Sequence, residues 1–383
     1  MPVVSLSPLH FSEGFLTIDV VLRLVGSTLL NPALSWVLPV GALARSLPSP
    51  SPSTLISLLR DPSALLHLAR TNTPLQLALA VYGVGAALWV NAQLSRAARN
   101  SFKRSTRAWR WDERGEVVVV TGGAGGLGSE VVRRLAEKGT RVVVLDVAPL
   151  PSDAPSTIKY YKVNLASKEE VDAAASKIIE EVGHPTVLIN MAGVVRAQSI
   201  LDMTAKDVDL TYDINVKAAY YTVQAFLPHM AREGHGHVIT IASSTGYHQA
   251  ATGVAYCSSK AAALSFHEGL TEELRHLYPS APSSPNAAAI RTSVICPAHF
   301  KTGMFAGFAN SIPAPFAPSL EVGTVAKLVC ETVWSGESQH IIEPFYAKCT
   351  PLGRALPTWL YGIILSFAKD AMGAVKEYKS KHA

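Results

Sequence analysis

The distribution of apolar residues divides the chain into two parts with different patterns. In the first hundred residues, apolar side chains gather in two uncharged stretches, 24–44 and 71–95. From residue 116 onward, short β-branched apolar runs alternate with segments of helical periodicity. Apolar runs without polar alternation are typical of parallel strands covered on both faces. The second part therefore predicts a doubly wound α/β sheet of the Rossmann type.

The strands and helices of this sheet are expected at regular intervals along residues 112–350. Seven strands are expected, at 116–121, 141–146, 158–163, 186–190, 237–243, 291–297 and 339–344. Helices are expected at 129–139, 168–182, 205–232, 255–277 and 321–335. The proline- and serine-rich insertion 279–289 is interpreted as a solvent loop.

Residues 1–111 predict a membrane-anchoring region. Segment 71–95 carries no charge over 25 residues, which is long enough to cross a hydrocarbon core as a helix. The following run, 96–110, holds six Arg or Lys and no acid. A basic run directly after an apolar segment favours a cytosolic location for everything beyond residue 96. Nucleic-acid binding explains this run less well, because it directly follows a membrane-type segment, and no nucleic-acid partner is expected.

Segment 24–44 leaves three arrangements open. It contains Pro32 and Pro39, so it can cross the membrane, dip in and return, or lie at the interface. Stretches 47–53 and 61–74 are interpreted as a linker. A mitochondrial transit peptide is an alternative for this region, which is rich in Arg and Ser. Transit peptides are amphipathic, however, whereas 71–95 is uniformly apolar, and this favours an anchor.

Composition and charge narrow the function further. Charged residues make up 16% of the chain and the formal net charge is +5. The four cysteines, Cys257, Cys296, Cys330 and Cys349, have no C-x-x-C or zinc-like spacing. We interpret them as buried thiols in a reducing compartment, and we expect no metal site.

A glycine-rich turn follows the first expected strand and opens the first expected helix. It reads Thr121-Gly122, then Gly126-Leu127-Gly128. Such glycines let the backbone approach a pyrophosphate, which then faces the helix N-terminus. Asp146 closes the second strand, eighteen residues after Gly128, and can accept hydrogen bonds from an unmodified ribose. Since no Arg or Lys follows Asp146 to bind a 2′-phosphate, NAD is favoured over NADP.

Tyr256 and Lys260 stand four residues apart in an expected helix and so share one face of it. Ser243 lies thirteen residues before Tyr256, at a strand end, where open α/β sheets place their chemistry. Together with the glycine turn, these residues resemble the short-chain dehydrogenase/reductase family over about residues 115–345. The other matching positions are Asp146, Asn190 with Ala192 and Gly193, Asn215, and the stretch from Pro297 to Thr302.

The resemblance implies a role for each matching residue. Tyr256 would be the acid/base, Lys260 would lower its pKa and bind the nicotinamide ribose, and Ser243 would polarise the substrate oxygen. Asn215 would hold a water that links Lys260 to solvent. The implied cofactor contacts are Gly122, Gly126, Leu127, Gly128, Asp146, Asn164, Leu165, Asn190, Ala192, Gly193, Tyr256, Lys260, Pro297, Phe300 and Thr302. Ser244 is the alternative serine, but neighbours on a strand point to opposite faces.

Three positions depart from the family pattern without removing a catalytic group. Met191 stands where a second asparagine is usual, Asn164 where an aspartate near the adenine is usual, and Ala298 where a glycine is usual. These departures bear on cofactor affinity and on rate, while the implied reaction class stays the same.

The remaining segments bear on substrate and location. Segment 299–319 is rich in Phe and is expected either to cover an apolar substrate or to pack as ordinary core. The tail 351–383 predicts an amphipathic helix with an apolar stripe, which lies on a membrane surface or docks on the domain. The anchor and the tail resemble the retinol and 17β-hydroxysteroid dehydrogenase-like branch of the family, at the endoplasmic reticulum or lipid droplets.

Two function classes follow. One is a membrane-anchored, NAD-dependent oxidoreductase for an apolar alcohol or ketone such as a retinoid, a steroid or another lipid. The other is a non-catalytic coat protein of a membrane or droplet that keeps the dehydrogenase fold. The intact set of Ser243, Tyr256, Lys260 and Asn215 favours the enzyme. The resemblance also implies a homodimer.

Overall fold

The computed structural model describes residues 17–47, 51–112, 115–305 and 317–366. These residues form two compact units that meet in sequence between Ala98 and Arg99. The second unit contains the predicted parallel sheet, and each unit is described by itself.

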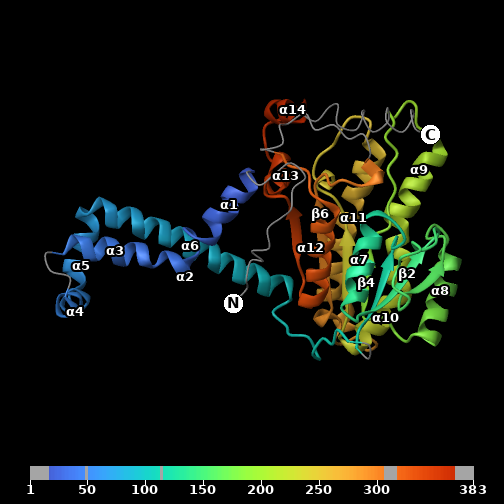
Figure 1. Cartoon of the computed structure of the whole chain (residues 1–383), viewed down its shortest axis with the longest axis horizontal. Helices are drawn as coiled ribbons and strands as arrows, with labels where there is room; N and C mark the ends of the chain where they lie inside the picture. Colours follow the sequence, from blue (N-terminus) through green and yellow to red (C-terminus); the bar gives the residue numbers. More distant parts are fainter. Residues whose placement is uncertain (1–16, 48–50, 113–114, 306–316, 367–383) are drawn as a thin grey trace. The chain divides into compact units, whose positions relative to one another are not determined.

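The sheet has seven parallel strands in the order β3-β2-β1-β4-β5-β6-β7 (Figure 1). The strands are β1 Val117–Thr121, β2 Arg141–Asp146, β3 Lys159–Lys162, β4 Val187–Asn190, β5 His237–Ile241, β6 Arg291–Pro297 and β7 His340–Glu343. All seven predicted strands and the parallel Rossmann topology are confirmed. The order reverses between β1 and β4, and in open α/β sheets ligands bind at such a switch point.

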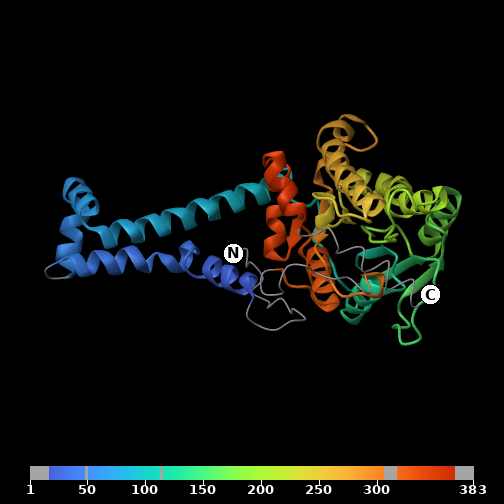
Figure 2. The same ribbon diagram turned by 90° about the horizontal axis from the view of Figure 1, so that it is seen from above.

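Helices cover both faces of the sheet, as the uninterrupted apolar strands require (Figure 1 and Figure 2). Val118 and Val120 of β1 face helices α7 Gly126–Glu137 and α12 Val322–Ser335. Val117 and Val119 point to the opposite face and pack with a second helical layer. That layer consists of α8 Lys168–Glu181, α10 Ala218–Glu233 and α11 Val254–Glu272.

Two helices predicted as continuous contain π-helical turns. The segment 205–232 is divided into α9 Ala205–Tyr212, a π-helical turn Asp213–Lys217, and α10. The segment 255–277 ends in a second π-helical turn, Glu273–Leu277. Such turns re-aim side chains and are frequent at functional sites. The first of them contains Asn215.

Two local predictions are wrong. The insertion 279–289 is not wholly a solvent loop, because its last three residues, Ala287–Ala289, form a buried 3₁₀ turn. Their small side chains let this segment lie close against the second helical layer. Cys257, Cys296 and Cys330 are buried thiols, but Cys349 is exposed on the 3₁₀ segment Phe345–Cys349.

The first unit is helical throughout its described residues. Its helices are α1 Ile18–Ser27, α2 Pro32–Ser35, α3 Val37–Ser46, α4 Pro52–Arg60, α5 Pro62–Thr71 and α6 Thr73–Arg99, which continues into the second unit. The predicted linker is therefore wrong where α4 and α5 lie. Each of these two helices has proline at its first position and a capping side chain before it, Ser51 or Asp61, so these prolines start helices instead of breaking them.

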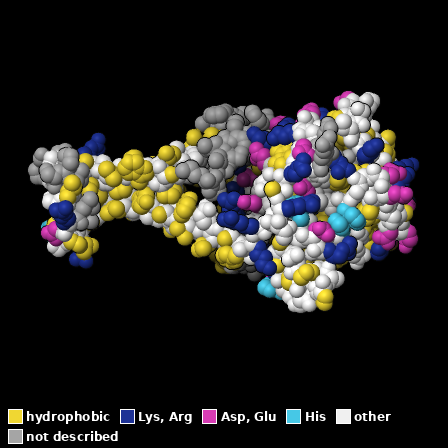
Figure 3. Space-filling model, turned by 90° about the horizontal axis from the view of Figure 1, so that it is seen from below, with side chains coloured by type: hydrophobic (Ala, Val, Ile, Leu, Met, Phe, Trp, Pro, Cys, Tyr) yellow, Lys and Arg dark blue, Asp and Glu magenta, His cyan; other side chains and the backbone are white. Residues whose placement is uncertain are grey.

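Helix α6 is long and apolar enough to span a membrane. Helix α1 and the pair α2–α3 pass the same test only together, and they are bent by 56°. This bend fits a broken span or a re-entrant loop. Figure 3 shows apolar side chains gathered on the surface of the N-terminal helices, and Leu77, Leu88 and Leu94 of α6 are more than half exposed.

The described C-terminal end consists of α13 Thr350–Gly353 and α14 Thr358–Ser366. Helix α14 carries no charge and none of its residues is buried. Trp359, Ile363 and Ile364 are its exposed large apolar residues. The rest of the predicted tail helix, 367–383, and the central part of the Phe-rich segment, 306–316, lie outside the described residues.

Candidate active site

A cavity of about 690 Å³ opens at the carboxyl ends of the strands. It brings together the glycine turn, the acidic end of β2 and helix α11, which carries Tyr256 and Lys260. The predicted residues that line it are Gly122, Gly126, Leu127, Gly128, Asp146, Asn164, Leu165, Ala192, Gly193, Ser243, Tyr256, Lys260, Pro297, Phe300 and Thr302. Asn190 and Asn215 do not line it; they border a much smaller void behind β4 and β5.

The glycine turn has the conformation that a close approach of backbone requires. Gly122 has a φ of +71°, and a side chain there would collide with the backbone of Ala192 at the end of β4. A side chain at Gly128 would overlap the carbonyl oxygen of Gly122. Helix α7 begins at Gly126, three residues before its predicted start, so its N-terminus faces the cavity. This arrangement suits a bound diphosphate.

The Asp146 carboxylate lies between two backbone N–H groups at the same end of the cavity. Its Oδ2 accepts from the N–H of Ala124 at 2.9 Å, and its Oδ1 accepts from the N–H of Ala148 at 3.0 Å. These bonds fix the orientation of the carboxylate, and each oxygen retains a lone pair for a further donor.

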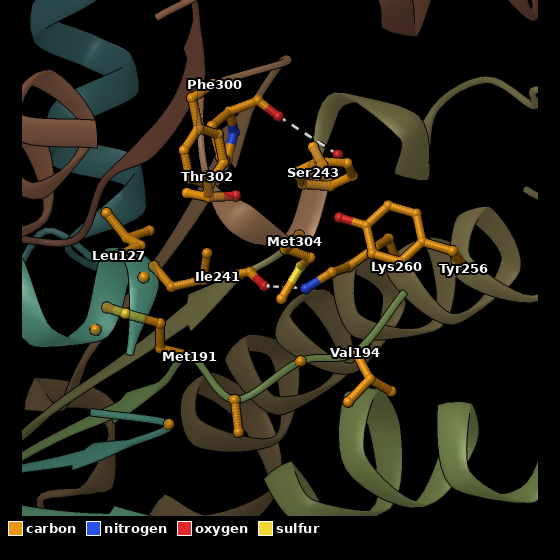
Figure 4. Close-up of a pocket in the computed structure, with 18 of the residues that line it drawn as sticks. Leu127, Met191, Val194, Ile241, Ser243, Tyr256, Lys260, Phe300, Thr302 and Met304 are labelled. Atoms are coloured by element: carbon orange, nitrogen blue, oxygen red, sulfur yellow. Dashed lines mark hydrogen bonds between the residues drawn. The ribbon is translucent and has the colours of Figure 1, made fainter. Parts of the chain in front are cut away.

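The hydroxyl of Tyr256 and the ammonium of Lys260 lie on the opposite wall (Figure 4). Lys260 Nζ donates to the carbonyl oxygen of Ile241 at 2.8 Å and lies 5.8 Å from the centroid of the Tyr256 ring. Ser243 follows β5, and its Oγ accepts from the N–H of Thr245 at 3.2 Å and from Thr245 Oγ1 at 2.9 Å. The serine is thereby held beside the tyrosine.

Burial dominates the acid–base properties of this pair. It raises the pKa of Tyr256, and the hydrogen bond with Ser243 acts in the opposite direction but is weaker. Burial also lowers the pKa of Lys260 to about 8. Burial therefore raises the pKa of the phenol, whereas the resemblance implied that Lys260 lowers it. Lys260 Nζ is itself buried and donates to Ile241 O. At neutral pH the tyrosine carries its proton and can act as an acid.

Asn215 and Asn190 act on the backbone and on neighbouring side chains. Asn215 Oδ1 accepts from the N–H of Val194 at 2.7 Å, while its Nδ2 donates to Val194 O at 3.0 Å and to Ser259 Oγ at 2.9 Å. Both amide protons are used within the protein, and the implied role of Asn215 in holding a water stays a prediction. Asn190 Oδ1 accepts from Thr222 Oγ1 at 2.7 Å, which ties β4 to α10.

The residues at the far end of the cavity fit a nicotinamide dinucleotide. Thr302 Oγ1 is buried and has no hydrogen-bond partner among the described residues, and it lies beside Phe300 (Figure 4). A buried hydroxyl without a partner is costly unless a ligand supplies one, and a carboxamide would do so. Ala298, where glycine is usual, does not have a positive φ, and its N–H donates to Glu343 O at 2.7 Å, so the alanine needs no glycine conformation here.

Several lining residues were not identified from the sequence. Among them are Val194, Leu210, Ile214, Thr245, His248, Ala250, Tyr346 and Thr350. Leu210 lies on α9 and Ile214 on the π-helical turn that follows it. The others come from loops, a short 3₁₀ turn and the segment after β7, and no motif marks them. The short distance between His248 and Ser243 along the chain was the only available signal. Burial lowers the pKa of His299 to about 4, so this residue is neutral in the cavity wall.

Comparisons with known proteins agree with this geometry. The short chain dehydrogenase family model matches residues 116–311. The chain is 38% identical over 235 residues to "Dehydrogenase RED2" of Cochliobolus heterostrophus, covering 60% of this chain and 83% of the relative. It is 30% identical over 275 residues to "Estradiol 17-beta-dehydrogenase 11" of Rattus norvegicus, covering 70% of this chain and 88% of the relative.

Among solved structures, the fold is similar to that of a short chain dehydrogenase from Burkholderia cenocepacia in complex with NADP. The TM-score is 0.54 at 24% identity, covering 66% of this chain and 98% of the other. At this identity the likeness concerns the fold alone. The family match and the two relatives carry the assignment: the chain belongs to the short-chain dehydrogenase family and is an NAD(P)-dependent oxidoreductase acting on CH–OH groups.

Proposed function

We propose that this protein is a membrane-anchored oxidoreductase that transfers hydride between NAD(H) and an apolar alcohol or ketone, with Tyr256 as the acid/base. One observation carries the proposal: a single cavity holds Ser243, Tyr256 and Lys260 at one wall and the glycine turn with Asp146 at another. The non-catalytic alternative offers no reason for these groups to converge on one cavity.

In the direction of ketone reduction, the protein supplies a proton and a hydrogen bond. The nicotinamide, when bound, supplies the hydride to the carbonyl carbon. Tyr256 donates its phenolic proton to the carbonyl oxygen, and Ser243 Oγ donates a hydrogen bond to the same oxygen. The raised pKa of Tyr256 keeps this proton in place until the oxygen becomes basic. Lys260 holds positive charge near the phenolate that is left.

The preference for NAD rests on Asp146. Its carboxylate lies at the end of β2 and would repel a 2′-phosphate while accepting bonds from an unmodified ribose. The similar Burkholderia structure was solved with NADP and a similar Brucella melitensis structure with NADH. The fold itself therefore accommodates either nucleotide, and the side chain at this position would discriminate between them.

The proposed substrate is an apolar alcohol or ketone such as a steroid, a retinoid or another lipid. The side chains of Val194, Leu210, Ile214, Met304 and Phe305 line the cavity, and the ring centroid of Phe305 lies 5.8 Å from that of Tyr256. The name of the 30% identical relative refers to estradiol, an apolar alcohol. Helix α6 and the bent pair formed by α1 and α2–α3 support attachment to a membrane. The basic run after α6 favours a catalytic unit in the cytosol. The resemblance to the membrane-associated branch implies the endoplasmic reticulum or lipid droplets as the location, and a homodimer.

The test is a comparison of the full-length protein with Tyr256→Phe. Purified protein is assayed by NADH absorbance with estradiol, retinol and long-chain secondary alcohols, and with the corresponding ketones. We expect Tyr256→Phe to lower kcat by at least about 100-fold, because it removes the proton donor and acceptor. Tyr221→Phe is the matched control: it removes a hydroxyl from α10 outside the cavity and should keep the wild-type rate.

Equal rates for wild type and Tyr256→Phe would rule out this mechanism. If the wild type also turned over none of the substrates while binding NADH, the coat-protein function would be favoured over the enzyme.

A further inference from the structure

The hydroxyl of Ser259 joins helix α11 to the Gly193–Val194 segment of the cavity wall. Ser259 lies on α11 between Tyr256 and Lys260 and is 0% exposed. Its Oγ donates to the carbonyl oxygen of Tyr256 at 2.7 Å and accepts from Asn215 Nδ2 at 2.9 Å. Asn215 in turn bonds both backbone groups of Val194, which lines the cavity. A continuous chain of hydrogen bonds therefore runs from the cavity wall to the backbone of Tyr256.

Only a side chain that donates and accepts at the same time can complete this chain. A hydroxyl does both, whereas alanine does neither. The second amide proton of Asn215 and its oxygen are already engaged with Val194. Loss of the Ser259 hydroxyl would therefore leave a buried N–H of Asn215 without an acceptor, and Asn215 or α11 would shift to find one.

The segment held by Asn215 also lies close to Lys260. A Cβ atom at Gly193 would stand 3.5 Å from Asn215 Oδ1 and 3.6 Å from Lys260 Nζ. A movement of α11 relative to Gly193 and Val194 thus displaces Lys260 together with Tyr256. Displacements of about 1 Å at a catalytic group can cost on the order of 100-fold in rate.

We propose that Ser259 is a positioning residue: through Asn215 it holds α11 in register with the Gly193–Val194 segment and so keeps the Tyr256 hydroxyl aimed into the cavity. The inference rests on the proposed function of Tyr256. Ser259 itself touches neither substrate nor cofactor in this role.

The adjacent serine offers a matched control. Ser258 Oγ also donates to the backbone of its own helix, to Val254 O at 2.7 Å, and accepts from Tyr212 at 2.8 Å. It is more exposed than Ser259, and no hydrogen bond joins it to Asn215 among the described residues. Ser258→Ala therefore removes a similar helix-to-side-chain bond without breaking the proposed connection.

The experiment measures kcat, KM and NADH affinity of the full-length variants with whichever alcohol or ketone the wild type turns over. For Ser259→Ala we expect kcat to fall about ten- to 100-fold, with KM and the NADH Kd within about threefold of wild type. Ser258→Ala should keep kcat within about twofold. In a double-mutant cycle, Asn215→Ala with Ser259→Ala should be no slower than Asn215→Ala alone, since one connection is broken in both.

A wild-type kcat for Ser259→Ala, or losses that multiply in the double variant, would overturn the proposal. Should Ser259→Ala not fold, Ser259→Cys retains a weak donor and acceptor, and it should fold with a kcat clearly below wild type. A kcat of Ser259→Cys as low as that of Asn215→Ala would also count against the proposal. These outcomes differ from failure of the proposed function, in which Tyr256→Phe itself would retain the wild-type rate.

Discussion

Lys260 is a basic side chain held in a site that is unfavourable for its charge. Burial lowers its pKa from the ordinary 10.5 to about 8, and one hydrogen bond to Ile241 O is its described polar contact. Below pH 8 the folded and unfolded chains both bind the proton, so the folded protein bears the full cost of the buried charge. Between pH 8 and 10.5 Lys260 has largely lost its proton in the folded protein but keeps it in the unfolded chain. The free energy of unfolding therefore rises with pH over this range as the cost of the buried charge disappears.

Replacing Lys260 by methionine should therefore stabilise the protein at neutral pH while abolishing activity. We expect a gain on the order of 2 kcal/mol at pH 7, after allowing for the lost hydrogen bond, and a smaller gain as the pH approaches 10.5. Thermal unfolding of wild type and Lys260→Met from pH 7 to 10 measures this difference in stability and its dependence on pH. Lys159→Met, at an exposed position, is the control and should show no such pH-dependent difference. A lower Tm for Lys260→Met at pH 7 would contradict the argument.

Asp146 makes a prediction about nucleotide choice. Asp146→Ser removes the negative charge at the end of β2 and should lower the NAD-to-NADP ratio of kcat/KM by at least about tenfold, mainly by improving the use of NADP. Steady-state kinetics with both nucleotides test this. Asp153→Ser, an exposed acid on the same β2–β3 connection, should leave the ratio unchanged. An unaltered ratio in Asp146→Ser would exclude Asp146 from this role.

At the scale of single residues, the spacing of residues along the sequence was enough to predict which side chains of one helix or strand end reach the cavity. Tyr256 and Lys260 share a helix face, and Ser243 follows a strand end, so all three reach one cavity. The partners of Asn215 could not be predicted. They depend on a π-helical turn and on a loop twenty-one residues away, which only the folded chain brings together.

At the scale of elements, the turn between β1 and α7 requires glycine at one of its positions and not at another. Gly128 packs against the carbonyl oxygen of Gly122, whereas a side chain at Gly125 would meet nothing within 4 Å. The fold therefore leaves no room for a side chain at residue 128 but leaves room for one at residue 125, although both glycines belong to one glycine-rich motif.

Gly128→Ala should therefore destabilise the catalytic unit, because its methyl group would force α7 away from β1. We expect a loss on the order of 2 kcal/mol or more, visible as a Tm lowered by several degrees, and weaker binding of NADH. Gly125→Ala is the matched variant and should keep the wild-type Tm. Equal Tm values for the two variants would mean that the turn adapts more freely than its geometry indicates.

Element boundaries were less predictable than element types. The apolar runs of β1, β2, β4, β5 and β6 identified these strands, since a run buried on both faces has a distinct composition. The edge strand β3 is not buried, and the regular alternation of strands and helices located it. Helices α4 and α5 were mistaken for a linker because proline and serine are common both in loops and at helix starts. The burial of Ala287–Ala289 was missed because small residues carry little pattern of their own.

At the scale of the whole molecule, residues 99–111 belong with the catalytic unit. Arg291, only 4% exposed, donates from its guanidinium to Asn100 O at 3.1 Å and to Lys103 O at 2.8 Å. Asn100 Oδ1 accepts from the N–H of Ser338 at 2.9 Å. Much of the basic run is therefore bound to the domain through its backbone, and a chain shortened at residue 112 would leave a buried arginine without these acceptors.

Two shortened chains test the proposed anchor and this connection together. Residues 99–383 should be released from membranes by alkaline carbonate and keep oxidoreductase activity, whereas the full chain should stay in the membrane pellet. Residues 112–383 should also be released but unfold at a Tm lower by several degrees. Resistance of residues 99–383 to carbonate would show that the anchor lies elsewhere, and identical Tm values would show that Asn100 and Lys103 contribute little.

The sequence alone determined the fold class, the glycine turn, the convergence of Ser243, Tyr256 and Lys260, and the long apolar helix α6. Each of these is encoded by neighbouring residues, through strand composition, helix periodicity or short spacing. The tertiary structure decided which groups meet across elements. These are the hydrogen bonds from Val194 through Asn215 to Ser259 and the bonds from Arg291 to the backbone of the basic run. It also decided the burial that shifts the pKa values of Tyr256 and Lys260. Desolvation and hydrogen bonding across elements depend on the packed surroundings, which no local pattern specifies.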